Sequence, residues 1–148
     1  MLRLPPPIWT MIYLAIAALV SWALGWPKVP GLPQPIIGGA IFFLAWIPPV
    51  WAFRLFQVEG TEIDPISETN RKLVTGGPFR FTRNPMYLGL VLSTFGIAVW
   101  LGDWPFLAVP PAVFATANFA HIPFEEAKMR RQFGAAFDDY ARRVRRWI

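Results

Sequence analysis

Four long apolar stretches dominate the pattern of the chain, over residues 8–24, 35–56, 85–101 and 104–124. Their interiors are almost free of formal charge, and each approaches the roughly 20 residues that an α-helix needs to cross a bilayer. Short connections rich in glycine, proline or aspartate separate the members of each pair, which is typical of helical hairpins. We therefore predict an all-α, polytopic membrane protein with four transmembrane helices in a single integral membrane domain, residues 1–148.

The pattern changes after residue 124, where charged residues begin to alternate with apolar ones at helical spacing. The apolar positions recur every three or four residues, at Met129, Phe133, Phe137, Tyr140, Val144 and Trp147. This spacing places them on one helix face. We predict an amphipathic interfacial helix over residues 125–147, with its arginines drawn to anionic membrane lipids. The pattern fits a lid over a binding site and a simple surface anchor equally well.

Lysine and arginine are distributed unevenly among the connections. One precedes the first stretch, one lies in the first connection and none in the third, whereas five lie between residues 54 and 83 and seven between residues 128 and 146. With four spans, thirteen of the fourteen basic residues share one side, which the positive-inside rule makes cytoplasmic. Both termini are therefore expected in the cytoplasm, with the chain in a bacterial inner membrane. The alternative for residues 8–24 is a cleaved signal peptide, which would break this charge pattern.

Composition excludes several kinds of chemistry. Hydrophobic residues make up 55% of the chain, more than a soluble domain of this length needs for its core. There is no cysteine and one histidine, His121, so thiolate catalysis and a histidine-rich metal site are excluded, and we expect no metal. The net charge of +5 comes from residues that flank apolar stretches, so we expect no nucleic-acid partner.

The connection over residues 57–84 carries the first cluster of candidate functional residues. Loops of this length are usually functional or disordered. Two glycines before Pro78 predict a turn with exposed N–H groups, and Asn84 followed by Pro85 predicts a helix cap and first helical residue. A helix N-terminus suits a carboxylate, and Tyr87 offers an aromatic face to a cation. On local pattern alone, Arg80 and Arg83 also fit interfacial anchors, and Asn84 fits an ordinary cap.

A second cluster, His121, Glu125 and Glu126, lies where the fourth apolar stretch ends. Ionisable groups at membrane depth are costly and usually functional. His121 and Glu125 are four residues apart, so on a helix they share a face and can address one bound molecule. Pro123 followed by two acids is also an ordinary helix start.

Two ordered motifs extend these clusters. Residues 72–87 match Leu-Val-Thr-x-Gly-Pro-Phe/Tyr-Arg-x-x-Arg-His/Asn-Pro-x-Tyr, and Glu125-Glu126 with residues 133–140 match a Glu-Glu element followed by Phe-Gly-x-x-Tyr/Phe-x-x-Tyr and a basic end. Together they resemble the isoprenylcysteine carboxyl methyltransferase and phospholipid methyltransferase superfamily of integral membrane enzymes. The resemblance covers about half of the chain, from Lys72 onward, and the first two apolar stretches match it only in general character.

The resemblance implies S-adenosylmethionine as cofactor and methyl transfer to a small lipophilic or lipid acceptor at the cytoplasmic membrane face. It places nine residues at the cofactor: Lys72, Leu73, Val74, Phe79, Asn84, Pro85, Met86, Tyr87 and Glu125. Glu125 would meet the amino-acid or sulfonium end of the cofactor. His121 and Glu126 are the catalytic candidates, which would hold or deprotonate the acceptor. Such a transfer needs no protein nucleophile, so positioning should dominate catalysis.

Two positions depart from the superfamily pattern. Asn84 stands where many members have histidine, which removes a titratable group. His121 stands where the isoprenylcysteine enzymes have an arginine for the substrate carboxylate, so prenylcysteine is disfavoured and the imidazole can serve as a base. The acceptor group stays open among amine, carboxylate, thiol and phenol, as does the oligomeric state. An NADPH-dependent membrane reductase of the sterol reductase type and a non-catalytic small membrane subunit remain as alternatives.

Overall fold

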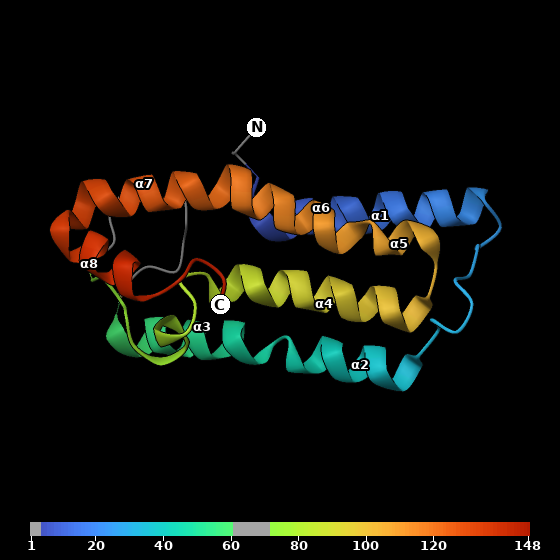
Figure 1. Cartoon of the computed structure of the whole chain (residues 1–148), viewed down its shortest axis with the longest axis horizontal. Coiled ribbons are helices and arrows are strands. Elements are labelled where there is room, and N and C mark those ends of the chain that lie inside the picture. The colour runs from blue at the N-terminus through green and yellow to red at the C-terminus, as the bar shows by residue number, and fades with distance from the viewer. Residues whose placement is uncertain (1–3, 61–71) are drawn as a thin grey trace.

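A computed structural model of the chain describes residues 4–60 and 72–148, and its regular elements there are helices (Figure 1). In these ranges the one β-type contact is an isolated bridge between Lys28 and Asp103. The predicted all-α class is thus confirmed for this part of the chain. Arg3 and Arg71, which contributed to the predicted orientation, and residues 61–71 of the predicted cofactor loop 57–84 lie outside the described ranges.

The apolar stretches of the sequence form the long rods of the fold. Three helical runs are long and apolar enough to cross a membrane, namely Pro6–Ala23, Pro35–Glu59 and Trp104–Phe133. The fourth, Pro85–Leu101, is apolar but shorter. Each run overlaps one of the four predicted stretches, and the last run extends beyond its predicted end at residue 124 to Phe133. That all four cross the bilayer stays a prediction.

Prolines interrupt two of these rods. Helix α2 (Pro35–Leu44) ends shortly before α3 (Ile47–Glu59), which has Pro48 and Pro49 in its first turn. The short α5 (Trp104–Leu107) gives way to α6 (Val109–Thr116), which likewise begins with two prolines. A proline has no N–H to donate and clashes with the preceding turn. The paired prolines therefore account for both breaks.

Helix α4 (Pro85–Leu101) lies in the middle of the fold, with α2 and α3 along one side and α5 and α6 along the other (Figure 1). Glycines allow α2 and α4 to approach closely. A Cβ atom on Gly38 would lie 2.4 Å from the Trp100 backbone nitrogen, and one on Gly96 would lie 2.6 Å from that of Phe42. Small residues are the usual means of close helix packing in membranes.

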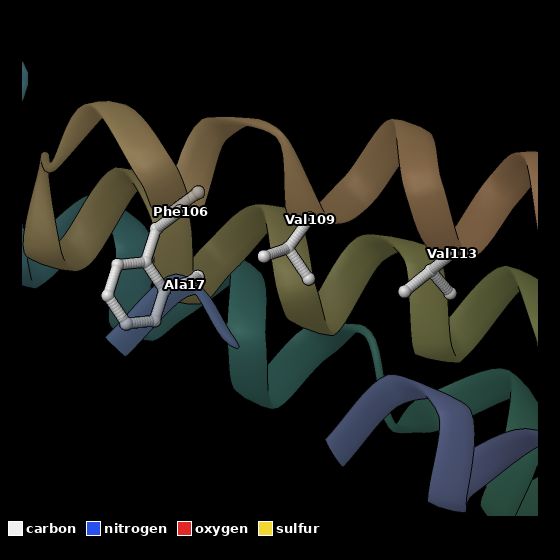
Figure 2. Close-up of a cluster of buried hydrophobic side chains, with 5 residues drawn as sticks. Ala17, Phe106, Val109 and Val113 are labelled. Carbon is white, nitrogen blue, oxygen red and sulfur yellow. The ribbon is translucent and has the colours of Figure 1, made fainter. Parts of the chain in front are cut away.

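On its other side, α4 shares a buried apolar cluster with α1 (Pro6–Ala23), α5 and α6. Ala17, Phe106, Val109 and Val113 pack together there (Figure 2). Many large apolar side chains elsewhere point outward, including Leu19 at 66% and Ile36 at 87% exposure. Such a surface is suited to lipid, because a soluble protein rarely exposes apolar patches of this extent.

The predicted amphipathic helix over residues 125–147 is wrong in its bounds. A π-helical segment, η2 (Ala117–His121), leads directly into α7 (Ile122–Phe133), and a separate α8 (Ala135–Arg143) follows. Gly134 ends α7 with a φ of 52° and a ψ of −127°, a conformation that glycine tolerates and other residues rarely adopt. Apolar spacing alone does not reveal this break.

The break at Gly134 turns α8 back over the bundle. Phe137 and Tyr140 become buried against Phe79 of η1 (Gly77–Arg80), a short 3₁₀ helix before α4. Val144 is extended, so the chain leaves helical structure after α8. Phe137 and Tyr140, which were predicted to face the membrane interface, thus pack inside the protein core instead.

Candidate active site

A cavity of about 690 Å³ opens at the end of the bundle where α3 ends and α4 and α7 begin. Its size is typical of sites for cofactors and other small molecules. All nine residues predicted at the cofactor line it, together with Glu126. They come from the segment before η1, from η1 itself, from the first turn of α4 and from α7. The fold therefore brings both sequence clusters to one place.

A hydrogen bond joins the two clusters inside this cavity. The Tyr87 hydroxyl donates to Oε1 of Glu125 over 2.5 Å. Tyr87 is buried and lies in the first turn of α4, whereas Glu125 lies in the first turn of α7. A carboxylate held beside an aromatic ring is a suitable partner for a cationic ligand.

The other walls of the cavity are mostly apolar. Phe79 packs against Phe56 with ring centroids 5.2 Å apart, and Leu73, Val74 and Met86 border the same cluster. Lys72 is mostly exposed and pairs with Glu59. Its position is therefore at the rim, while the apolar residues form a surface suited to a flat aromatic group.

Tyr140 supports this wall from α8. Its hydroxyl donates to the backbone carbonyl of Phe79 over 2.8 Å. Burial raises the pKa of Tyr140 above its ordinary value, so the phenol stays protonated and keeps donating at physiological pH. Sequence reasoning treated Tyr140 only as part of an apolar helix face, although its place in the second motif was a usable signal.

Asn84 occupies the predicted N-cap position of α4, but its side chain does not cap the helix. Its amide instead donates to the backbone carbonyl of Arg146 over 2.9 Å. The predicted helix start is therefore confirmed, but the side-chain cap is not made, because the amide is turned toward residues 144–148, which run beside the start of α4. The sequence pattern suggested only an anchoring role for Arg83, which in the structure lines the cavity and bonds to Glu126.

His121 does not line the large cavity. It borders a separate space of about 10 Å³ with Thr10, Tyr13 and Thr116, and its Nε2 atom is buried with no hydrogen-bond partner among the residues that the structure describes. Its ring stacks on Tyr87 at a centroid distance of 6.2 Å. His121 and Glu125 were expected to address one bound molecule. In the structure both contact the same protein side chain, Tyr87.

The cavity also has an apolar limb that neither motif predicted. It is formed by residues before and within α1, by α3 and by the part of α4 after Tyr87, including Pro6, Trp46, Pro49 and Leu90. These positions lie in the stretches that the motifs leave uncovered. Among the described residues, no group of three or more histidines and acids is placed to hold a metal ion.

Comparison with known protein families gives a match over most of the chain. The sequence profile of the phospholipid methyltransferase family matches residues 33–136. The chain belongs to this family. The match includes both clusters that meet in the cavity and ends before the larger part of α8. No solved structure matches the chain.

Three curated relatives show how widely the similarity extends. Protein-S-isoprenylcysteine O-methyltransferase B of Arabidopsis thaliana is 37% identical over 78 residues, 52% of this chain and 39% of the relative. Phosphatidyl-N-methylethanolamine N-methyltransferase of Emericella nidulans is 32% identical over 95 residues, which cover 64% of this chain and 47% of the relative. Methanethiol S-methyltransferase 2 of Bradyrhizobium diazoefficiens is 31% identical over 147 residues, which cover 95% of this chain and 49% of the relative. The chain spans less than half the length of each.

Proposed function

We propose that this member of the phospholipid methyltransferase family transfers a methyl group from S-adenosylmethionine to a small lipophilic or lipid acceptor at the cytoplasmic membrane face. One observation carries the proposal. Residues from two motifs, 38 positions apart at Tyr87 and Glu125, meet by a direct hydrogen bond in the wall of a single cavity.

The residues of the cavity fit this cofactor. The volume of about 690 Å³ is in the range that accommodates ligands of drug or cofactor size. Leu73, Val74 and Phe79 offer an apolar surface to the adenine ring, and the Glu125 carboxylate suits the positively charged end. When bound, the cofactor supplies an electrophilic methyl group on a cationic sulfur.

The protein contributes positioning and exclusion of water. Tyr87 orients the Glu125 carboxylate through its hydroxyl and is itself braced by the His121 ring. We therefore assign His121 the role of supporting Tyr87 instead of the role of base, since Tyr87 separates it from the large cavity. The apolar walls keep water away from the reacting groups, which favours transfer to the acceptor over hydrolysis.

The apolar limb is our candidate for the acceptor site. It lies between α1, α3 and α4, whose outer faces carry exposed apolar side chains such as Phe53, so an apolar acceptor has a short path from lipid. The names of the three relatives cover oxygen, nitrogen and sulfur acceptors. Their shared requirement would be an apolar molecule, and the nucleophile is left to experiment.

Methyl-labelled S-adenosylmethionine tests this proposal. We expect the protein, purified in detergent, to move label into one class within a panel of lipophilic thiols, amines, phenols and carboxylates. The Glu125→Gln variant should lose this transfer while remaining folded. Reduction of a lipophilic substrate with NADPH, with no label transferred, would contradict the proposal and favour a reductase.

A further inference from the structure

Residues 144–148, here called the return segment, run back from α8 across the start of α4. The backbone N–H of Arg83 donates to the Arg145 carbonyl over 3.0 Å. The Asn84 amide donates to the Arg146 carbonyl over 2.9 Å. The return segment therefore lies beside Arg83 and Asn84, the two residues that immediately precede the first turn of α4.

The far end of the return segment is fixed to the helices before α7. The Trp147 indole N–H donates to Oδ1 of Asn118 over 3.0 Å, and Arg146 reaches the same oxygen over 3.3 Å. The Trp147 ring also packs against Phe114, with centroids 4.7 Å apart. These contacts tie α6 and η2 to the segment that crosses α4.

Glu126 lies at the centre of this arrangement. Its Oε1 accepts from Arg83 Nη2 over 2.7 Å and its Oε2 accepts from Arg146 Nη2 over 2.8 Å. Arg83 also donates to the carbonyls of Ala141 and Val144. Glu126 is only 6% exposed, and its hydrogen bonds raise the pKa of Arg146. Both oxygens of this carboxylate are engaged by guanidinium groups, so Glu126 is not placed to act as a base.

The two adjacent acids of α7 thus have different partners, one in the first turn of α4 and one just before this helix. Glu125 accepts from Tyr87 and Glu126 accepts from Arg83, which lies four positions earlier. Successive helical residues point about 100° apart, so Glu125 reaches Tyr87 while Glu126 reaches the two arginines, and both acids line the cavity. The pair fixes the start of α7 against the start of α4.

We propose that Arg83, Glu126 and Arg146 form a clasp through which the return segment sets the position of Glu125 and Tyr87 in the cavity. Glu126 is then a positioning residue for cofactor binding, an inference that rests on the proposed function. Removing its charge leaves two buried or half-buried guanidiniums without their shared partner, a costly arrangement that moves the wall of the cavity.

Binding calorimetry of purified variants with S-adenosylmethionine tests the clasp. We expect Glu126→Gln and Arg146→Met each to weaken binding about tenfold, because small displacements of positioning groups have large effects. The double variant should be no weaker than either single variant. Arg145→Met is the matched control, because its side chain is exposed and only its backbone carbonyl joins the network; its affinity should stay within about twofold.

Hydrogen exchange at the Arg83 amide provides a second measurement that needs no cofactor. Its exchange should rise in Arg146→Met and stay unchanged in Arg145→Met. If the wild type fails to bind S-adenosylmethionine, the proposed function fails, and the exchange result still decides whether the clasp exists. If Glu126→Gln does not fold, Trp147→Phe replaces it with a smaller expected loss of affinity, because it removes the indole N–H bond to Asn118 and reduces the ring contact with Phe114.

Two results would overturn the inference. The first is wild-type affinity together with wild-type exchange in folded Glu126→Gln and Arg146→Met proteins. The second is a Glu126→Gln protein that binds S-adenosylmethionine normally but has lost turnover, because that pattern identifies a base instead of a positioning residue.

Discussion

The Tyr87 hydroxyl and the Glu125 carboxylate are joined by a hydrogen bond of 2.5 Å at the wall of the large cavity. The bond links the first turn of α4 to the first turn of α7. Each of these turns contains residues of one of the two sequence motifs. Whatever occupies the cavity meets a carboxylate whose position is set by a buried phenol.

Substitutions at this pair should weaken cofactor binding to different extents. Glu125→Gln removes the negative charge that attracts the cationic end, so we expect at least about a tenfold loss of affinity. Tyr87→Phe keeps the ring but loses the donor, and the expected loss is about three- to tenfold. Titration calorimetry with S-adenosylmethionine measures both.

Tyr13 provides the matched control for Tyr87→Phe. Its hydroxyl bonds to Thr116 over 2.7 Å, and it borders the small space beside His121 but not the large cavity. Tyr13→Phe should therefore bind S-adenosylmethionine like the wild type. Equal weakening in the Tyr13 and Tyr87 variants would mean that the loss reflects general destabilisation.

His121 should tolerate replacement by another aromatic residue. If its role is to brace Tyr87, His121→Phe preserves the stacking and should keep turnover within about threefold, whereas His121→Ala should lose more. Steady-state kinetics with the identified acceptor separates these cases. Turnover abolished in His121→Phe with unchanged cofactor affinity would restore His121 as the base.

Because α2 packs closely on α4, we expect an added methyl group between these helices to lower the stability of the protein. In Gly38→Ala the new Cβ would lie 2.4 Å from a backbone nitrogen, which cannot move without shifting the helix. We expect a loss of about 1–3 kcal/mol, as for other overpacked sites. Gly39→Ala is the control, because its Cβ would be an ordinary 3.5 Å from the Trp100 ring. Thermal unfolding in detergent should show a lower midpoint for Gly38→Ala alone.

The orientation of the chain can be tested cleanly because it has no cysteine. Pro30 and Arg131 are both exposed, and they lie at opposite ends of the bundle. We expect a membrane-impermeant maleimide, added to spheroplasts, to label Pro30→Cys and to leave Arg131→Cys unmodified. The reverse result would place the cavity on the outer side and contradict the proposed cytoplasmic termini.

Sequence reasoning reached the rods of the fold through local signals, and it reached the composition of the cavity wall through the resemblance to the methyltransferase superfamily. Apolar runs of sufficient length form helices that satisfy their own backbone in lipid, and paired prolines such as Pro48 and Pro49 mark where a helix must break. The motif around Asn84 and Tyr87 placed these residues at the same site as Glu125, and the structure brings them to one cavity.

What the sequence did not reveal depends on contacts between distant segments. The exclusion of His121 from the large cavity follows from the intervening Tyr87 ring, and helical spacing cannot indicate what stands between two groups. The turn at Gly134 requires a backbone conformation that apolar spacing does not encode. The bonds of Glu126 to Arg83 and Arg146 exist only because the return segment crosses α4.

Calorimetric titration of the detergent-purified wild type with S-adenosylmethionine, with its demethylated product and with NADPH is the most direct test of the central claim. We predict saturable binding of the first two ligands at one site per chain, with no binding of NADPH. Failure of folded protein to bind either S-adenosylmethionine or its product would contradict the account, and saturable binding of NADPH in their place would identify the cavity as the site of a reductase.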